Sequence, residues 1–196
     1  MMRKNATLLL IALLVTATAH AQESAPKEKT EAEAIMEAYV EAAKPVAEHQ
    51  RLAELSGPWN VTTSLWFGPE APEQKSTGSG SGRMILGGRF LQLDTTVRGA
   101  MNHEAVTIMG YDRRTGEYTM FGIDTLGTYS ITAKGRYDAR RQAIVLDGSY
   151  AQPPSGNEQK YRFVLTSPSS REHLMTLFFE MDGKDVRVAE TRYTRE

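Results

Sequence analysis

The sequence predicts a mainly all-β protein, an antiparallel up-and-down barrel of about ten strands preceded by one or two N-terminal helices. Segments of alternating polar and apolar residues follow one another from Trp59 to Arg195. Short turns rich in Gly, Asp and Asn connect these segments, and no helical pattern interrupts them. An open sheet of this size would leave two unpaired edges, whereas closure into a barrel removes both.

The N-terminus has the features of a cleaved export signal. Arg3 and Lys4 precede an almost unbroken apolar run from Ala6 to Thr18, and Ala19-His20-Ala21 has the A-x-A pattern of a cleavage site. The apolar run is too short for a membrane-spanning helix. We therefore expect cleavage before Gln22 and a periplasmic or secreted location.

Composition limits the classes of partner. Cleavage would leave 175 of the 196 residues, enough for one domain with a substantial core. It would also remove two basic residues and no acidic ones, which changes the net charge from −1 to −3. This balance argues against nucleic acid or an anionic membrane as partner. The chain contains no Cys, so an exported form has no disulfides and depends on its core.

A helical segment is expected before the strands. Thr30 and Glu33 form a capping box, and apolar residues then recur at helical spacing. Pro45 ends or kinks this helix, and Gly57-Pro58 stops its continuation. The predicted divisions are a signal peptide at 1–21, a disordered lead-in at 22–29, a helical segment at 30–55 and the barrel at 57–195.

The clearest hairpin signal is Gly87-Gly88, because a two-residue turn needs residues with positive φ. Such a turn sets Leu86 opposite Arg89 and Ile85 opposite Phe90. One face of this hairpin would then carry Met84, Leu86, Leu91 and Leu93. The expected strands are 59–67, 76–86, 89–98, 102–111, 117–124, 128–137, 143–150, 160–166, 172–181 and 185–195.

A glycine-rich run, residues 78–82, lies inside the second expected strand. It lacks the G-x-S-x-G pattern of a hydrolase because Gly80 occupies the central position. It also leads into a strand and not into a helix N-terminus, so it does not resemble a phosphate-binding loop. We interpret it as a flexible or bulged strand.

An ordered set of short motifs resembles a known family. The motifs are Pro45-x-x-x-His49, Leu55-x-Gly57-x-Trp59, Gly87-Gly88-Arg89-Phe90, Gly110-Tyr111-Asp112, Tyr118 to Asp124, Gly135-x-Tyr137-Asp138 and Glu190-x-x-Tyr193-Thr194-Arg195. Together they are similar to the bacterial domain-of-unknown-function family numbered fifteen seventy-nine. The resemblance implies a calycin-like barrel, as in lipocalins and fatty-acid-binding proteins, and no known reaction. Gly122 departs from the family pattern, which often has Trp there.

Closure of the barrel predicts a contact between the two ends of the chain. The first and last strands become neighbours, so Arg195 or Arg192 is expected to cover the Trp59 ring by cation–π stacking. This cluster is either a structural plug or a ligand contact. Glu190 shares an alternating face with Val186 and Val188, so an inward face would place its carboxylate inside the barrel beside Arg192.

Three functional hypotheses stay open. The first is a non-enzymatic barrel that binds a small, partly apolar or amphipathic molecule in its lumen. The second is a hydrolase or isomerase that uses Glu190 or Asp124 with a lumen Arg. The third is an envelope or partner-binding protein with a solid core. The candidate ligand-binding residues are Trp59, Arg89, Tyr118, Asp124, Glu190, Arg192 and Arg195.

No catalytic motif, metal site or cofactor is predicted. The histidines after the signal are His49, His103 and His173, and none has a neighbour at metal-ligand spacing. His49 is expected to be a hydrogen-bonded packing residue. Short loops and charged strand residues such as Lys134 and Arg187 argue against an outer-membrane barrel, so no membrane span is predicted.

Overall fold

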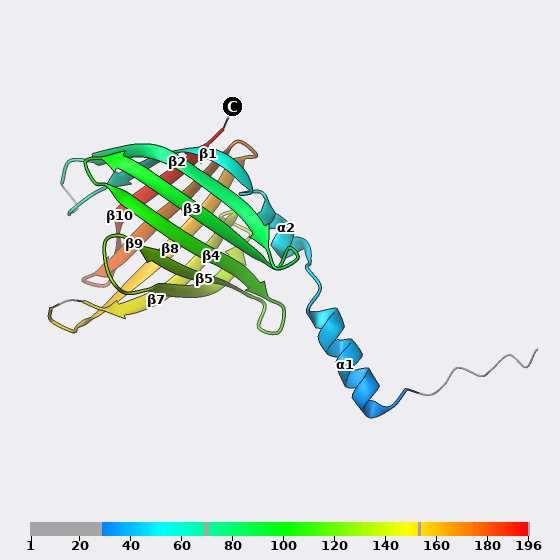
Figure 1. The fold of residues 1–196 in the computed structure, drawn as a ribbon. Helices are drawn as coiled ribbons and strands as arrows, with labels where there is room; N and C mark the ends of the chain where they lie inside the picture. The colour runs from blue at the N-terminus through cyan, green and yellow to red at the C-terminus, as the bar shows by residue number, and fades with distance from the viewer. Residues whose placement is uncertain (1–28, 69–70, 153, 196) are drawn as a thin grey trace, which may run out of the picture.

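The protein folds as a closed antiparallel barrel with two helices before it (Figure 1). The computed structural model describes residues 29–68, 71–152 and 154–195. Each strand pairs with its neighbours in sequence, and β1 pairs with β10 to close the barrel. The strands are β1 (Gly57–Leu65), β2 (Gln74–Ile85), β3 (Phe90–Gly99), β4 (His103–Asp112), β5 (Glu117–Asp124), β6 (Ile131–Asp138), β7 (Ala143–Ala151), β8 (Glu158–Ser169), β9 (Glu172–Met181) and β10 (Lys184–Thr194). The predicted fold class is confirmed.

Barrel closure is explicit in the pairing of the first and last strands. Asn60 lies opposite Thr194, and Leu65 lies opposite Ala189, in an antiparallel register without a break. Pairing removes the two edges that an open sheet would expose. The expected export signal and most of the expected lead-in lie outside the described residues.

Two helices precede the barrel, α1 (Glu31–Ala42) and α2 (Ala47–Ala53). The predicted capping box is present, since the Glu33 amide donates to Thr30 Oγ1 at 3.3 Å and the Thr30 amide donates to Glu33 Oε2 at 2.8 Å. The helix ends before Pro45, which fits the missing amide donor of proline. No residue of α1 is buried, and the helix projects away from the barrel (Figure 1). No helix in the described part of the chain is long and apolar enough to cross a bilayer.

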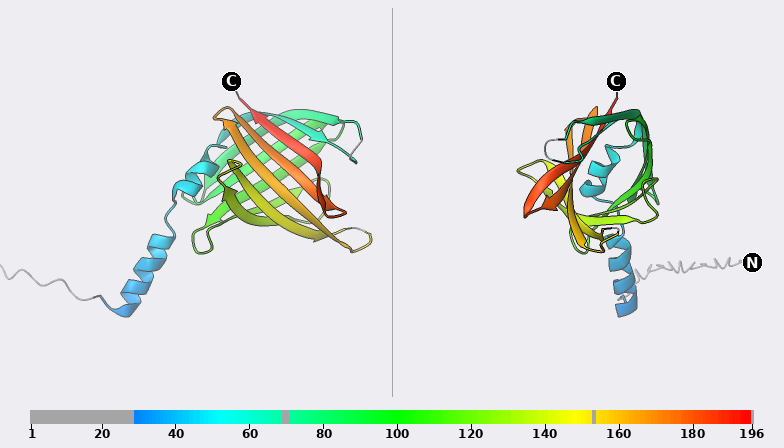
Figure 2. Two further views of the ribbon diagram at one scale, coloured as in Figure 1. Left: turned by 180° about the vertical axis from the view of Figure 1, so that it is seen from behind. Right: turned by 90° about the vertical axis from the view of Figure 1, so that its left-hand side faces the viewer.

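Helix α2 plugs one end of the barrel. Seen through the barrel from the opposite end, α2 lies within the ring of strands (Figure 2). Its Leu52, and Leu55 just after it, are almost fully buried in the hydrophobic core. We call this end, where β1 begins, the plugged end. The other end, where β1 leads into β2 and β9 into β10, is the open end.

The Gly87-Gly88 hairpin has the predicted register but a longer loop. Ile85 lies opposite Phe90, as expected, while residues 86–89 form a four-residue loop. The amides of Gly88 and Arg89 both donate to the Ile85 carbonyl, at 3.1 and 3.2 Å. This geometry puts Leu86, Gly87 and Gly88 at positive φ, and Leu86 is exposed. The predicted two-residue turn, with Leu86 on the same face as Met84, Leu91 and Leu93, is therefore wrong.

The glycine-rich run is a regular part of β2. Its register with β1 and with β3 is unbroken, so the expected bulge is absent there. A Cβ on Gly82 would lie 2.0 Å from the Leu55 carbonyl oxygen, and one on Gly80 would lie 3.1 Å from Val61 Cγ2. Glycine is thus favoured here because the chain after α2 and a side chain of the neighbouring strand β1 approach the β2 backbone closely.

Candidate functional site

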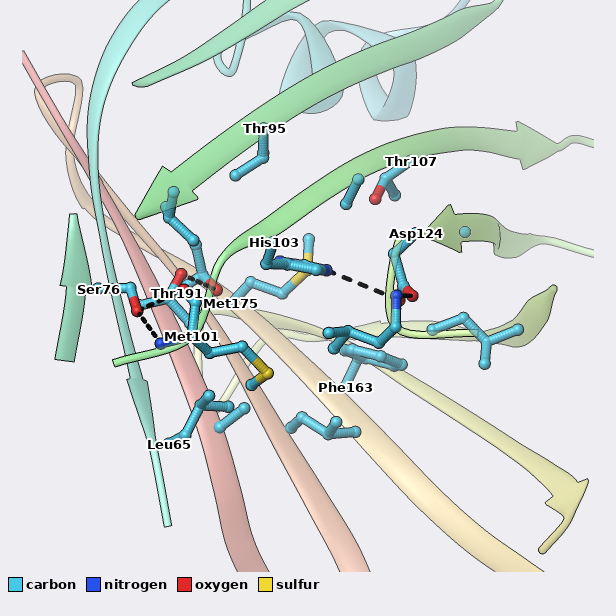
Figure 3. A pocket seen from close by; sticks show the side chains of 18 of the residues that line it. Leu65, Ser76, Thr95, Met101, His103, Thr107, Asp124, Phe163, Met175 and Thr191 are labelled. Atoms are coloured by element: carbon cyan, nitrogen blue, oxygen red, sulfur yellow. Dashed lines mark hydrogen bonds and ion pairs between the residues drawn. The ribbon is translucent and has the colours of Figure 1, made fainter. Parts of the chain in front are cut away.

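The candidate site is a cavity of about 190 Å³ in the barrel lumen towards the open end (Figure 3). Side chains from most of the strands converge on it. The lining residues are Thr63, Leu65, Ser76, Thr95, Val97, Met101, His103, Ala105, Thr107, Met120, Gly122, Ile123, Asp124, Leu126, Ile131, Phe163, Met175, Leu177, Ala189, Thr191 and Tyr193. The lumen is therefore filled at the plugged end and hollow towards the open end.

Residue size explains why the lumen is hollow on one side only. Towards the plug, inward positions carry large buried side chains such as Leu91, Met109 and Tyr118. Around the cavity, several inward positions are small, including Ala105, Gly122, Ala189, Ser76 and Thr191. Because inward residues alternate along each strand, one small residue per strand leaves a continuous space.

Gly122 makes a particular contribution to this space. It is buried in β5 and lines the cavity. A Cβ at this position would lie 3.1 Å from Ile131 Cγ1. A larger side chain at this position would project into the lumen, so glycine keeps this part of the cavity open.

A His–Asp pair is the main polar feature of the cavity. His103 begins β4 and Asp124 ends β5, and both belong to the open end. His103 Nε2 lies 3.7 Å from Asp124 Oδ2 (Figure 3), which is too long for a direct hydrogen bond. The Nε2 atom is buried and has no hydrogen-bond partner among the described residues. Asp124 Oδ1 accepts from the Leu126 amide at 2.8 Å, which orients the carboxylate.

Most of the other polar groups of the cavity have hydrogen-bond partners. The hydroxyls of Thr63 and Thr191 lie 3.2 Å apart, across the β1–β10 pair. Thr95 Oγ1 and the Tyr193 hydroxyl are also 3.2 Å apart, and burial raises the pKa of Tyr193. Ser76 Oγ donates to the Met101 carbonyl at 2.8 Å. His103 Nε2 and the Thr107 hydroxyl are thus the polar groups of the lining without a hydrogen-bond partner among the described residues.

Only Asp124, among the seven predicted ligand-binding residues, lines this cavity. Trp59 and Arg195 meet at the plugged end, where Arg195 Cζ lies 4.2 Å from the Trp59 ring centroid. The predicted contact between the chain ends is therefore present and uses Arg195, not Arg192. The Trp59 indole donates to the Leu55 carbonyl at 2.8 Å, and its ring packs edge-on against His173. These contacts make it part of the plug.

Tyr118 also belongs to the plugged end. Its hydroxyl accepts a hydrogen bond from Arg51 of α2 at 2.7 Å, and burial raises its pKa. The same guanidinium lies 3.9 Å from the Tyr137 ring centroid, so Arg51 ties α2 to the barrel wall twice. Arg89 lies in the β2–β3 loop and donates to the Leu86 carbonyl at 3.1 Å. A ligand contact by Tyr118 or Arg89 stays a prediction.

Glu190 lies on the outer face of the barrel, which corrects the hypothesis of an inward carboxylate. A register shift between Arg187 and Ala189 inserts one residue into β10. Before this shift, Val186 lies opposite Phe179, a residue that packs on the core. After the shift, Ala189, Thr191 and Tyr193 point into the lumen, so Glu190 points outward. A bulge reverses the alternation that the sequence pattern assumes.

Ion pairs on the outside of the barrel hold Glu190 and Arg192. Glu190 pairs with Arg192 at 3.4 Å and with Arg187 at 3.6 Å, and Arg192 also pairs with Glu172. The lining of the cavity contains no Arg or Lys among the described residues. A reaction centre built from Glu190 and a lumen Arg is therefore not formed.

His49 and His173 are packing residues near the plug. The Val46 amide donates to His49 Nδ1 at 3.1 Å, as expected for a hydrogen-bonded packing residue. Ser167 Oγ lies 2.7 Å from His173 Nδ1. Burial lowers the pKa of both histidines, and the nearby Arg195 charge further lowers that of His173. The described residues contain no group of three or more His, Asp or Glu side chains placed to hold a metal ion.

His103 is a cavity residue that was not among the predicted ligand-binding residues, because it has no neighbour at metal-ligand spacing. A usable signal was the alternation of His103 with Ala105 and Thr107, which puts His103 on the inner face once that face is known. Its proximity to Asp124 depends on the β4–β5 register, where Ala105 lies opposite Asp124.

Comparison with known proteins gives one family assignment. A family model described as a protein of unknown function (DUF1579) matches residues 44–195, which span α2 and the whole barrel. No curated protein matches the chain.

Proposed function

This chain belongs to the DUF1579 family, whose function is unknown, and we propose that it is an exported, non-enzymatic barrel that binds a small, partly apolar molecule in its lumen. The observation that carries the proposal is the cavity of about 190 Å³ at the open end. Ligand sites are typically concave, mostly apolar and provided with a few convergent polar groups. This cavity has that character, because Met, Leu, Ile and Phe side chains form much of its wall and the His103–Asp124 pair is its main polar feature.

The arrangement of the barrel supports binding over a solid core. One end is closed by α2 and by buried side chains such as Leu52, Leu55 and Trp59, so the cavity has a closed floor. The other end gives access from solvent. A protein whose lumen only served stability would gain free energy from larger side chains at the small inward positions, because filling a cavity adds apolar contacts.

Native mass spectrometry of protein purified from its own host tests the proposal. A small molecule that co-purifies and dissociates on activation supports lumen binding. The matched variant is Ala189→Leu, which places a larger side chain in the cavity wall and should remove the adduct. Its folding is checked by thermal melting. Unliganded protein across several growth conditions, or an adduct that Ala189→Leu retains, would contradict the proposal.

Export is part of the proposal and has its own test. The Ala19-His20-Ala21 pattern and the basic and apolar segments before it support cleavage before Gln22. Intact-mass measurement of protein from the periplasm or the medium should give a chain that begins at Gln22. A mature mass that retains residues 1–21 would contradict an exported form.

A proton-transfer enzyme is the second candidate, because His103 and Asp124 form an acid–base pair beside an apolar cavity. The enzyme hypothesis from the sequence used Glu190 or Asp124 with a lumen Arg. Here Asp124 is kept, and His103 takes the place of the Arg. It predicts turnover of the co-purifying molecule that is lost in both Asp124→Asn and His103→Gln. Stoichiometric binding without turnover favours the non-enzymatic function.

A further inference from the structure

We propose a second binding site at the plugged end of the barrel, which takes a small organic anion with an aromatic body. The site is a groove of about 390 Å³ lined by the end of α1, the β2–β3 loop and the β4–β5 turn. We call it the basic groove, because Lys44, Arg89, Arg113 and Arg114 line it. It shares no lining residue with the lumen cavity, so this inference goes beyond the proposed function.

Segments that are far apart in the sequence build the basic groove. Arg89 and Phe90 come from the β2–β3 hairpin, and Tyr111 comes from the end of β4. Phe90 lies opposite Gly110 in the β3–β4 register, and a Cβ on Gly110 would lie 2.6 Å from Phe90 Cδ1. His49 of α2 packs edge-on against Tyr111, with the ring centroids 5.8 Å apart. The groove is therefore held in place by strand register and by the plug, and not by one loop.

Two partly buried guanidinium groups of the groove have no carboxylate partner among the described residues. Arg89 Nη1 donates to the Leu86 carbonyl at 3.1 Å, and Arg113 Nη1 donates to the Glu41 and Lys44 carbonyls. These bonds fix both side chains and leave Nε and Nη2 of each without an acceptor in the described part of the chain. A partly buried cation without an anion is unfavourable, and a guanidinium presents its donors in a fork that matches a carboxylate or a phosphate.

The acidic side chains around the basic groove are already paired. Asp112 is the only acidic residue in its lining, as far as the structure describes the chain, and lies 2.8 Å from Arg114 Nη2. This pairing with Arg114 lowers the pKa of Asp112 to about 2, so the pair as a whole is neutral near pH 7. Glu41, just outside the lining, pairs with Lys44. The uncompensated positive charge of the groove therefore comes from Arg89 and Arg113.

His49 shows that these two charges act at one place. Burial lowers the pKa of His49, and the charges of Arg113 and Arg89 lower it further, whereas the charge of Glu48 raises it. Both guanidinium groups are therefore close to one residue of the groove wall. The Val46 amide donates to His49 Nδ1 at 3.1 Å, so the neutral ring carries its proton on Nε2 and is a further donor at this wall. Such a set of donors fits an anion and repels a cation.

Aromatic side chains give the basic groove its apolar part. Tyr39 of α1, Phe90 and Tyr111 line it together with Ala42 and Ala43. Tyr39 is 68 % exposed, so its ring offers a large area for a ligand to cover. The volume of about 390 Å³ lies within the range of small-molecule sites. An oxyanion that carries an aromatic body uses both parts of the groove, whereas a free inorganic anion uses only the charged part.

A series of probes with one ring system tests the inference on the purified protein. The probes are 2-naphthoate, 2-naphthyl phosphate, 2-naphthalenemethanol and inorganic phosphate, and titration calorimetry measures their dissociation constants. The tighter of the two naphthyl anions should bind at least about tenfold more tightly than the neutral alcohol and than inorganic phosphate. Which of the two binds more tightly distinguishes a carboxylate ligand from a phosphate ester. Added salt should weaken the anions and leave the alcohol unchanged, because it screens partly exposed charges.

The decisive variant is Arg89→Gln, which removes one unpaired charge and does not touch α1. It should weaken the tighter naphthyl anion by about tenfold or more and leave the affinity of the alcohol unchanged. Arg113→Gln should have the same effect, although it also removes the bonds to the end of α1. Arg140→Gln is the matched control, since it makes the same change in the β6–β7 turn, at the same end of the barrel and outside the groove. Thermal melting checks that each variant folds.

The Ala189→Leu variant separates this site from the lumen. Binding of the naphthyl anion should survive Ala189→Leu, because Ala189 lines the lumen cavity and not the basic groove. An anion that depends on Arg89 and survives Ala189→Leu supports the groove even if no lumen ligand co-purifies. Absence of binding by both naphthyl anions, equal affinity of the alcohol, an unchanged affinity in Arg89→Gln, or loss of the anion in Ala189→Leu each overturns the inference. None of these results decides whether the lumen binds a molecule, which the native mass spectra test separately.

Discussion

Arg195 covers the indole of Trp59, with its guanidinium carbon 4.2 Å from the ring centroid, and so joins the last strand of the barrel to the first. The same guanidinium donates from Nη1 to the Ser56 carbonyl at 3.0 Å and from Nη2 to the Ser170 carbonyl at 2.8 Å. One side chain therefore connects three segments at the plugged end. The cation is held over the ring by these hydrogen bonds, which makes the contact more than a mobile surface interaction.

Removal of the indole should be costly. Trp59 is 3 % exposed and packs in the core, so Trp59→Ala should lower the free energy of unfolding by about 3–5 kcal/mol. Arg195→Ala should cost less, because a cation–π contact contributes about 1–2 kcal/mol. Urea unfolding of the purified variants measures both.

A double-mutant cycle isolates the contact itself. Because the two residues share one interaction, Trp59→Ala combined with Arg195→Ala should cost less than the sum of the single changes. Arg192→Ala, on the outer face of the same strand, is the matched control and should be additive with Trp59→Ala. Additivity for Arg195 as well would mean that the stacking contributes nothing to stability.

The β2–β3 loop gives a prediction about backbone conformation. Gly88 has φ of 81°, and a Cβ there would meet only Pro45 Cγ at 3.8 Å, an ordinary contact. Gly88→Val should therefore cost about 1–2 kcal/mol through backbone strain and not through a clash. Gly88→Asn is the control, since Asn tolerates this conformation better. Equal unfolding midpoints for the two variants would contradict the assigned φ.

The alternation of the strands predicted the barrel and the Trp59–Arg195 contact but not the position of Glu190. Barrel closure follows from the number and order of the strands, so its prediction does not depend on the exact strand ends. For example, β6 begins at Ile131, although the predicted strand begins at residue 128. The direction of Glu190 depends on the register shift between Arg187 and Ala189. No residue type in that segment marks a bulge, so simple alternation gives the wrong face.

The cavity was less predictable than the fold. Its volume depends on which inward positions of many strands lie at the same height, and that height is fixed by long-range registers. His103 meets Asp124 only because Ala105 lies opposite Asp124, a pairing that neither local sequence specifies. The role of Gly80 and Gly82 was likewise hidden, because their close neighbours, Val61 of β1 and the Leu55 carbonyl, come from earlier parts of the chain.

Buried histidines should make the protein sensitive to acid. Burial lowers the pKa of His49 and His173 below the ordinary value of 6.5. The unfolded chain then binds protons before the folded one as the pH falls, so the stabilisation is fully present above pH 6.5 and is lost progressively below it. The free energy of unfolding, measured by urea titration at a series of pH values, should fall with pH below this point.

The slope of the unfolding free energy against pH, and not its absolute value, shows whether a given histidine contributes to the acid sensitivity. His173→Gln cannot ionise and should flatten the acid side of the curve even if the variant is less stable throughout. An acid slope that His173→Gln leaves unchanged would show that His173 does not contribute to it.

The last prediction concerns the close contact between β2 and the plug. A Cβ on Gly82 would lie 2.0 Å from the Leu55 carbonyl oxygen, a backbone atom that no rotamer change can move away. Gly82→Ala must therefore displace either β2 or the chain between α2 and β1, and overpacking of this kind costs about 1–3 kcal/mol or more. Ser81→Ala, the exposed neighbour on the same strand, should change stability by less than about 0.5 kcal/mol. Because Leu52 and Leu55 fill the plugged end, Gly82→Ala should also speed amide hydrogen exchange in α2. Equal stability and exchange in the two variants would mean that the plug does not seat against β2 as described.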